Sequence, residues 1–407
     1  MSEAPFEDVR IEGHLIDSGI MSQVMDRIIA LDGEFETISF DVGRTNEDVS
    51  VAVLRVRAQD MQRLAEILGD VQEYGAVSCH PEDVQLRPAP QDGVFPEAFY
   101  ATTNLETDVR IGGSWVRVTC PEMDLGIRIE PETGTASAIA MSAVRAGDLF
   151  VVGHAGLRVH PQERPREREA FEFMASEVSS EKPKAQVIAE VARMMREARA
   201  DGKDVIAVVG PAVIHTGAGQ HLARLVRAGY VSVLFGGNAV ATHDIESALY
   251  GTSLGVSLER GVPAARGHEH HLRAINSIRG CGSIEAAVEQ GVLTSGLMHT
   301  VVMTGTPYVL AGSIRDDGPL PGVITDVVEA QNAMRSYCQS AGACLMLSTM
   351  LHSIATGNML PASVQTVCVD INPAVVTKLS DRGSWQTIGI VTDVGLFLEQ
   401  LADKLDA

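Results

Sequence analysis

The chain of 407 residues lacks the features that would suit it to secretion or to a membrane. It has no run of about eighteen uncharged apolar residues, the length that a membrane-spanning helix needs. Its first residues, MSEAPFEDVR, are acidic and contain no apolar core of a secretory signal. Its six cysteines form no CxxC pair, and a chain of this size needs no disulfide bonds to stay folded. The sequence therefore predicts a cytoplasmic protein with reduced thiols.

Positive charge and metal-binding motifs are scarce as well. Lys and Arg total 32 against 53 Asp and Glu, a net charge of −21, which argues against nucleic acid or anionic lipid as a partner. The cluster GHEHH at 267–271 is not HExxH, because Leu272 stands three residues after Glu269. No set of Cys and His has the spacing of a zinc site. No metal is therefore expected.

What the sequence does contain is an α/β pattern in three parts, the first being residues 1–92. Its order of elements is βαββαβ, which is typical of a ferredoxin-like module. We expect strands at 9–16, 35–42, 49–58 and 84–89, and helices at 20–31 and 61–74. In the third strand Ala52 and Leu54 alternate with Arg55 and Arg57, which is the period of a strand. Such small modules more often regulate or dimerise than catalyse.

The second part, residues 93–182, contains short apolar runs separated by Gly, Asp or Pro. This pattern predicts a small β-rich domain, a sandwich or a barrel. The polar, proline-broken stretch 160–168 predicts a linker or a solvated hinge at its end.

The third part, residues 183–407, alternates strands with helices, which predicts a mainly parallel, Rossmann-like sheet. We expect helices at 184–199, 219–228, 325–340 and 393–405, and strands at 205–210, 231–236, 307–313, 344–349, 364–371 and 388–393. The apolar runs end in Gly, Asp, Asn and Pro. Because the carboxyl ends of parallel strands meet at one edge, function should lie between about residues 210 and 393.

The segment GPAVIHTGAG at 210–219 follows the first of these strands. It approaches the dinucleotide motif GxGxxG, but Leu222 replaces the third glycine after Gly217 and Gly219. The glycines either let a phosphate approach the backbone at a helix start or serve a turn with positive φ. Two acids also end strands, Asp370 and Asp393, and each suits either a ribose hydroxyl pair or the N-cap of the next helix.

Charged and polar residues gather at the same strand ends. In SIRDDGPLP, Arg315 can clamp a carboxylate, while Asp316 and Asp317 can accept a proton or hold an ammonium group. A surface turn is the alternative, although the position at the sheet edge favours function. His243 and His352 suit either packing or a polar pocket. Other polar residues that favour the pocket are Asn238, Asp244, Glu246 and Asn358.

These segments carry a resemblance to a known family. The C-terminal part resembles the archaeal-type ornithine cyclodeaminases and the matching region of the cyanobacterial bifunctional arginine dihydrolases. The segments that carry it are GPAVIHTGAG, GGNAVATHDIE, YGTSLGV, GHEHHLRAIN, GSIRDDGPLP, TMLHSIATGNMLP, CVDINPAVVTKLSDRGS and GIVTDVG. The segments IEGHLIDSGIMSQVMDRI and VSVAVLRVRA resemble the LOR/SDH-type module that precedes this region in the family. The resemblance covers nearly the whole chain.

The resemblance implies NAD in a variant, deoxyhypusine-synthase-like Rossmann domain and the conversion of L-ornithine to L-proline and ammonia. Hydride would leave Cα of ornithine, the δ-amine would attack the resulting imine, ammonia would leave, and hydride would return to the ring. This chemistry needs a carboxylate clamp, a base for the amines and a dry pocket. Asp370 favours NAD over NADP, because a carboxylate repels a 2′-phosphate.

The family positions imply the following site. Residues expected to line the NAD site, several of them through the backbone, are Asn238, Ala239, Asp317, Thr349, Met350, Asn358, Leu360, Pro361, Asp370 and Asp393. Residue type and strand-end position favour Asp316 or Asp317 as the acid/base, with His352 and Lys378 as alternatives. Arg315 or His243 would lie near the substrate carboxylate, and Asn104 and Asp124 either close over the substrate or serve structure.

Two alternatives remain open at this point. A cyclodeaminase or dehydrogenase acting on another amino acid, such as lysine, shares every motif, because one methylene changes only the pocket size. A non-catalytic sensor of NAD or amino acids is the other, since the first module is of a regulatory type. That module and the family also predict a homo-oligomer.

Overall fold

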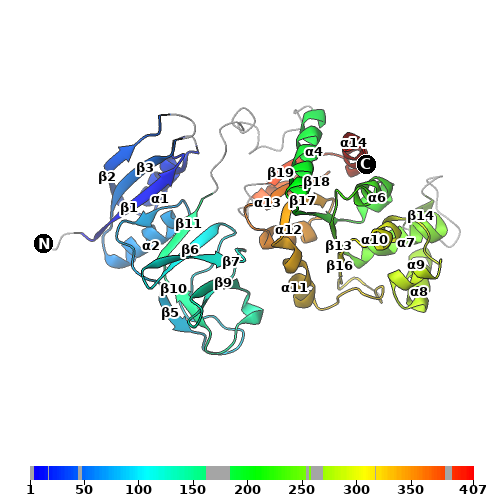
Figure 1. Cartoon of the computed structure of the whole chain (residues 1–407), viewed down its shortest axis with the longest axis horizontal. Helices are drawn as coiled ribbons and strands as arrows, with labels where there is room; N and C mark the ends of the chain where they lie inside the picture. Colours follow the sequence, from blue (N-terminus) through cyan, green and yellow to red (C-terminus); the bar gives the residue numbers. More distant parts are fainter. Residues whose placement is uncertain are drawn as a thin grey trace. The chain divides into compact units, whose positions relative to one another are not determined.

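The computed structural model describes residues 4–16, 18–44, 48–161, 184–253, 256–257, 269–316, 318–380 and 387–407. It divides into two compact units, Met1–Phe173 and Met174–Ala407 (Figure 1). None of the helices in these described ranges has the length and hydrophobicity that a membrane span requires.

The first sheet of unit 1 confirms the predicted ferredoxin-like module. Its elements are β1 (Phe6–Gly13), α1 (Ile20–Ala30), β2 (Glu34–Asp41), β3 (Ser50–Arg57), α2 (Met61–Gln72) and β4 (Val77–Ser78). The strands pair antiparallel in the order β2-β3-β1-β4. Buried and half-buried residues alternate along β3, and the buried ones, such as Leu54 and Val56, pack on Val24 of α1 and Ile67 of α2. The period-two pattern of the sequence is therefore the core pattern of the sheet.

One strand of this module was predicted in the wrong place. The expected last strand, 84–89, forms β5 (Gln85–Pro88), which pairs with β10 (Leu149–Val152) in the second sheet. The place in the first sheet belongs to the two-residue β4, which pairs with β1. Such a short strand cannot be predicted from the sequence, because two residues are too few to show the alternating pattern of a strand.

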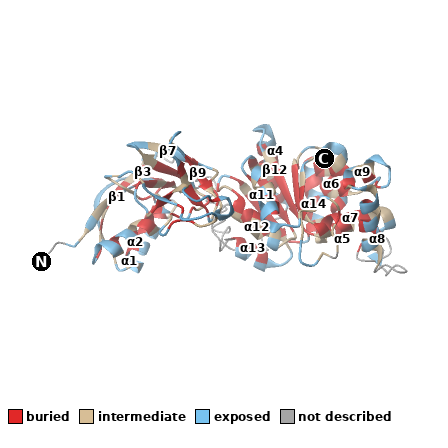
Figure 2. Ribbon diagram, turned by 90° about the horizontal axis from the view of Figure 1, so that it is seen from below, coloured by how far each residue is buried: buried red, intermediate tan, exposed pale blue. Residues whose placement is uncertain are grey.

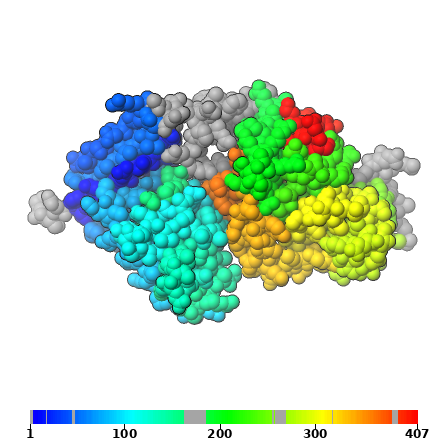
Figure 3. Space-filling view, viewed as in Figure 1, coloured from blue at the N-terminus to red at the C-terminus, as the bar shows by residue number. Residues whose placement is uncertain are grey.

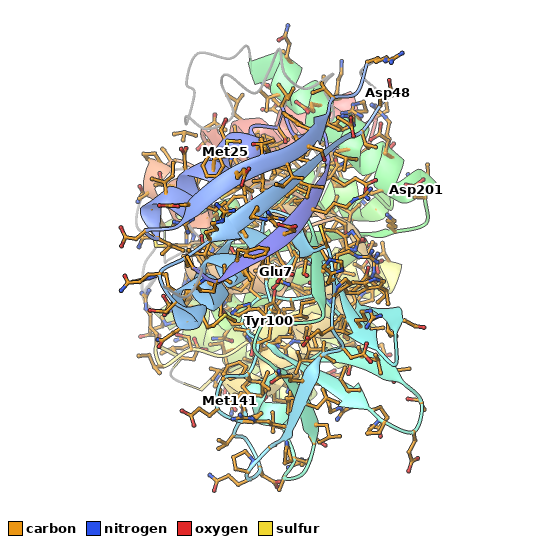
Figure 4. All side chains as sticks on the ribbon, turned by 90° about the vertical axis from the view of Figure 1, so that its left-hand side faces the viewer. Glu7, Met25, Asp48, Tyr100, Met141 and Asp201 are labelled. Atoms are coloured by element: carbon orange, nitrogen blue, oxygen red, sulfur yellow. The ribbon has the colours of Figure 1, made fainter. Side chains whose placement is uncertain are left out.

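The second sheet of unit 1 confirms the predicted β-rich domain. Its strands run in the order β11-β6-β7-β9-β8-β10-β5. The remaining members are β6 (Glu106–Ile111), β7 (Ser114–Thr119), β8 (Gly126–Glu130), β9 (Thr135–Ile139) and β11 (Leu157–His160), with a 3-10 turn at Met141–Ala143. Its buried aromatics include Phe150 and Tyr100, the second of which is labelled in Figure 4. The Tyr100 ring meets that of His154 edge-on at 5.7 Å. The predicted linker, 160–168, begins at the end of β11, and its residues after 161 lie outside the described ranges.

Unit 2 is built on a parallel sheet in the order β16-β13-β12-β17-β18-β19. The strands are β12 (Asp204–Val209), β13 (Val233–Gly237), β16 (Tyr308–Ala311), β17 (Ala341–Leu347), β18 (Gln365–Asp370) and β19 (Thr387–Val391). Each pairing between neighbours is parallel. If these six strands are numbered 1 to 6 along the chain, their order across the sheet is 3-2-1-4-5-6, which is the Rossmann order. The predicted fold class is confirmed.

Helices cover both faces of this sheet, so its strands are buried on both sides. The described helices of this unit are α4 (Lys184–Ala200), α5 (Ala212–His215), α6 (Gly219–Arg227), α7 (Asn238–Tyr250), α8 (His270–Cys281), α9 (Ile284–Glu289), α10 (Leu297–Thr304), α11 (Val327–Cys338), α12 (Leu351–Met359), α13 (Pro373–Ser380) and α14 (Val394–Lys404). A short hairpin, β14 (Thr252–Ser253) and β15 (Val256–Ser257), follows α7.

The two faces of the sheet belong to two hydrophobic cores. Along β12, Ala207 and Val209 belong to one core, while Ile206 and Val208 belong to the other (Figure 2). This double burial explains why the strand sequences are continuous apolar runs. The last helix, α14, packs beside α4, where Arg196 donates a hydrogen bond to the carbonyl oxygen of Lys404 at 2.6 Å (Figure 3).

Candidate active site

The centre of the candidate site is the point where the strand order reverses, between β12 and β17. Gly210 follows β12 directly and donates its N–H to the carbonyl oxygen of Leu347 at 2.8 Å. A Cβ at Gly210 would lie 1.9 Å from the carbonyl oxygen of Ser348, so only glycine fits there. Ser348 itself has φ +51°, a conformation that a non-glycine residue rarely adopts. Such local strain is typical of functional sites.

The glycines of the 210–219 segment serve different purposes. Gly217 has φ +77° with open space around it, so it follows the expectation of a turn that needs positive φ. Gly210 has no positive φ and is required by the close approach of the neighbouring loop. Gly219 is the first residue of α6.

Asn238, at the end of β13, ties two segments of the edge together. Its side chain is buried, and its Oδ1 accepts hydrogen bonds from the N–H of Leu320 at 3.0 Å and from Oγ1 of Thr242 at 3.3 Å. The first bond holds the segment that follows β16 against the start of α7. The predicted charged segment, 313–321, is therefore anchored at the sheet edge.

Within that segment the charged side chains have different surroundings. Asp316 accepts the N–H of Ser313 at 2.8 Å, so its carboxylate closes a turn, as the surface-turn alternative expects. Arg315 is exposed. Asp317, the favoured partner of Asp316 and a predicted NAD contact, lies outside the described residues.

His352 approaches the same edge from α12. A Cβ on Gly237 would come within 3.0 Å of Cε1 of His352, which places the imidazole against the end of β13. Burial lowers the pKa of His352, so its ring is neutral near pH 7. Thr349 and Met350 precede α12 at the end of β17.

The far end of α12 lies away from the carboxyl edge of the sheet. Because β17 ends at the carboxyl edge and β18 begins at the opposite edge, α12 runs back along the sheet. Asn358, Leu360 and Pro361 stand at this returning end, and Leu360 is buried in the core on that face. The structure therefore separates them from Thr349 and Met350 along the helix.

The strand-end acids mainly organise the next helices. Oδ1 of Asp393 accepts the N–H of Leu396 at 3.0 Å, which confirms the expected cap of α14. Asp370 accepts the N–H of Asn372 at 2.8 Å, and Asn372 in turn accepts that of Ala374 at 3.0 Å. Asn372, rather than Asp370 as one alternative expected, therefore makes the capping contact within α13.

Two helices that begin at the edge have no capping side chain within the described ranges. The N-terminus of α7, after Gly237, and that of α12, after Met350, receive no capping hydrogen bond from a side chain. Their first N–H groups therefore point toward the edge with no capping side chain among the described residues, which suits an anionic group. Lys378 of α13 adds positive charge nearby, with Nζ 3.9 Å from Sδ of Met350.

Asp244, one of the polar residues that favoured a pocket, caps a distant helix in the structure. Its carboxylate is buried and accepts the N–H groups of Leu297 and Met298 at 2.8 and 2.7 Å, at the start of α10. Burial raises its pKa to about 6, although the two hydrogen bonds oppose the shift. Asp244 is thus a helix-capping residue whose partners are 53 and 54 positions away, beyond the reach of sequence pattern.

His243 and Glu246 instead form a pair along α7. Nδ1 of His243 lies 2.9 Å from Oε2 of Glu246, whose side chain is fully buried. The ring of His215, from α5, meets that of His243 at 4.8 Å. Sequence reasoning missed His215, although it stands inside the GPAVIHTGAG segment. No group of three or more possible metal ligands occurs among the described side chains, which include His270 and His271 but not His268.

The two predicted substrate residues of unit 1 lie on adjacent segments. The N–H of Asp124 bonds the carbonyl oxygen of Thr102 at 3.0 Å, and Oγ1 of Thr102 donates to that of Glu122 at 2.6 Å. Asn104 is buried, and its Nδ2 has no hydrogen-bond partner in the described structure. Asp124 is exposed with φ +63°.

Comparison with known proteins covers nearly the full chain. Residues 189–401 match the family described as "Arginine dihydrolase ArgZ-like, C-terminal, Rossmann fold", and 106–188 match its first region. Residues 6–105 match the LOR/SDH bifunctional enzyme conserved region.

Individual relatives agree with these matches. An ornithine cyclodeaminase of Methanopyrus kandleri is 53% identical over 98% of this chain and 97% of its own. The apo structure of the cyanobacterial arginine dihydrolase ArgZ matches this structure with a TM-score of 0.86 and 40% sequence identity. The match covers 100% of this chain and 59% of ArgZ. AgrE of Nostoc, solved with ornithine and NAD+, has a TM-score of 0.54 and 44% identity over 99% of this chain and 58% of AgrE. The chain belongs to the family of archaeal ornithine cyclodeaminases and ArgZ-like C-terminal regions.

Proposed function

We propose that the protein is an ornithine cyclodeaminase that converts L-ornithine to L-proline and ammonia with bound NAD. The observation that carries the proposal is the edge at the β12/β17 switch point, in a chain 53% identical to an ornithine cyclodeaminase. A relative of the same family, AgrE, has been solved with ornithine and NAD+ together. Both support ligands of these two kinds at this edge.

The residues at the edge fit a dinucleotide. The uncapped N-termini of α7 and α12 offer N–H groups to the phosphates, and Lys378 stands close to the second. Asp370 retains an oxygen for a ribose hydroxyl pair, and its charge disfavours a 2′-phosphate. We therefore keep NAD as the cofactor. Of the expected set, Asn238, Ala239, Asp317, Thr349, Met350, Asp370 and Asp393 are proposed to line it, whereas Asn358, Leu360 and Pro361 stand at the far end of α12 and are no longer proposed.

NAD, when bound, would accept a hydride from Cα of ornithine and later return one to the ring. The protein must hold the substrate carboxylate, take protons from two amines and exclude water. For the carboxylate, Arg315 is favoured over His243, because the Glu246 carboxylate already stands against the His243 ring. Asn104 and Asp124 stay proposed substrate contacts from unit 1.

The acid/base residue is proposed among Asp316, Asp317, His352 and Lys378. His352 is neutral near pH 7 and can accept a proton. Asp316 is half-buried and keeps one carboxylate oxygen outside the bond to Ser313. If single replacement of Asp316 and Asp317 by Asn leaves turnover unchanged, neither is the acid/base residue.

The experiment that tests the function is incubation of the purified protein with L-ornithine and catalytic NAD. Proline and ammonia should appear in equal amounts without accumulation of NADH. Stoichiometric NADH would instead identify a dehydrogenase. If no product forms from ornithine but lysine or another diamino acid is turned over, the substrate is that other amino acid. NAD binding without any turnover would indicate a sensor.

Further parts of the proposal concern organisation. We propose three domains with the expected bounds 1–92, 93–182 and 183–407, except that β5 (Gln85–Pro88) joins the second domain. We also propose a cytoplasmic location and a homo-oligomer. Size measurement by light scattering tests the last of these, and a monomer at micromolar concentration would contradict it.

A further inference from the structure

A chain of hydrogen bonds runs along one side of α7. Nδ1 of His243 lies 2.9 Å from Oε2 of Glu246, and Oγ1 of Thr252 donates to Oε1 of the same carboxylate at 2.9 Å. Nδ1 of His270 lies 2.8 Å from Oγ1 of Thr252. The ring of Tyr250 stacks on that of His270 at 5.0 Å and closes the far end.

These bonds determine which ring nitrogens carry hydrogen. A carboxylate only accepts, so Nδ1 of His243 donates to Glu246. Thr252 gives its single hydroxyl proton to Glu246, so Nδ1 of His270 must donate to Thr252. Nε2 of His243 is left to accept a proton, and the resulting imidazolium is stabilised by the fully buried carboxylate of Glu246.

A second imidazole stands beside the first. The rings of His215 and His243 meet edge to face with centroids 4.8 Å apart, and Nδ1 of His215 lies 2.6 Å from Oγ of Ser253. Burial and the neighbouring His243 lower the pKa of His215, against the opposing effect of Glu246. Besides each other, the described groups that face the His215–His243 pair are Glu246 from α7 and Ser253 and Thr252 from β14. Through Thr252, His270 from α8 is connected to them.

The pair lies next to the candidate site. His215 is five residues after Gly210, at the end of β12, and His243 is five residues after Asn238, at the end of β13. Helices α5 and α7 are in contact, and α7 contacts α8 (Figure 2). His215 ends α5, the first helix after Gly210, and His243 stands about one and a half helical turns beyond Asn238, the first residue of α7.

We propose that His243 and His215 hold the two protons that the acid/base residue of the site removes from the substrate amines, and that Glu246 is the positioning residue that orients His243. This inference rests on the proposed function. The α-ammonium of ornithine must lose one proton before hydride can leave Cα to NAD, and the δ-ammonium must lose one before its nitrogen attacks Cα. Both protons return at the end, one to the departing ammonia and one to the proline nitrogen. Two imidazoles hold the two protons in between.

The test compares Glu246→Gln with Glu289→Gln, an exposed residue of α9 that serves as the control. Glu246→Gln keeps the size and removes the charge that stabilises the His243 imidazolium. We expect kcat for proline formation to fall about 10- to 100-fold, the size of loss seen when a carboxylate that orients a metal-bound histidine is removed. The acid limb of the pH profile should move to lower pH, and NAD affinity should stay unchanged. Glu246→Asp should restore part of the activity.

The outcomes separate this inference from the proposed function. If the wild-type protein makes no proline from ornithine, the proposed function fails. If the wild type is active and Glu246→Gln matches Glu289→Gln in kcat and in pH profile, the relay is wrong although the function stands. A fall in kcat with an unmoved acid limb would mean a merely structural role and would also overturn it.

A second measurement serves if Glu246→Gln does not fold. In the wild-type protein labelled with ¹⁵N-histidine, the nitrogen shifts report the tautomer of each ring. We expect His243 to carry its proton on Nδ1, with assignment from His243→Gln. The Nε2–H tautomer at His243 would refute the proposal.

Discussion

The close contact at the switch point makes Gly210→Ala the most informative single substitution. The added Cβ would lie 1.9 Å from the carbonyl oxygen and 2.6 Å from the carbonyl carbon of Ser348, whereas real Cβ atoms do not come within 3.0 Å. Both atoms are backbone, so no side chain can rotate away. The segment that leads from β17 to α12 must therefore shift.

The expected magnitude follows from this overlap. Overpacking in a well-packed region costs about 1–3 kcal/mol, and a backbone collision belongs at the upper end. A loss of this size lowers Tm by roughly 6–12 °C in a domain of this length. Because Met350 and the uncapped start of α12 move with the segment, NAD affinity should also fall roughly tenfold, which is 1.4 kcal/mol.

Gly236→Ala is the matched control, on the neighbouring strand β13. There the added Cβ would meet Leu310, Val240 and the backbone oxygen of Val209 at 3.6–3.8 Å, which are ordinary contacts. Thermal unfolding with and without NAD, together with an NAD titration, measures both effects. A Gly210→Ala protein with the Tm and the NAD affinity of Gly236→Ala would refute the reasoning.

Two further predictions concern buried and capping carboxylates. Burial raises the pKa of Asp244 to about 6, above its usual 3.8, so the folded state keeps a proton that the unfolded chain has lost, and stability falls as pH rises through this window. Asp244→Asn should abolish this dependence, which amounts to about 1 kcal/mol between roughly pH 5.5 and 7.5 in urea unfolding; an unchanged dependence would contradict the assignment. Asp393→Ala should destabilise the protein by about 1 kcal/mol through loss of the α14 cap, whereas Asp393→Ser should keep stability. If NAD affinity falls in Asp393→Ser while Tm holds, Asp393 contacts NAD as well; equal Tm in all three proteins would exclude the cap.

Much of the fold was predictable because the signals that specify it are local. The alternation in β3 and the double-sided apolar runs of β12, β17 and β18 reflect burial on one face or on both, which a strand shows in its own residues. The cap of Asp393 on α14 spans three residues and is equally visible. The short β4 lacked such a signal, and β5 was consequently assigned to the wrong sheet.

The candidate site was predictable only to the level of the sheet edge. Strand ends gave Asn238, Asp316, Thr349 and Asp370, because parallel strands bring their carboxyl ends together. The hydrogen-bond partners of these residues could not be predicted from the sequence. The bond from the N–H of Leu320 to Asn238, for example, joins residues 82 positions apart.

The sequence by itself thus determined the elements, their parallel arrangement, the family and the edge where chemistry belongs. Only the tertiary structure decided the strand order, and with it the switch point where Gly210 meets Ser348. It also assigned Asp244 to a distant helix start and joined His215 to His243 and Glu246. The physical reason is that periodicity and caps act within a few residues of chain, whereas these contacts form only when separate elements pack together.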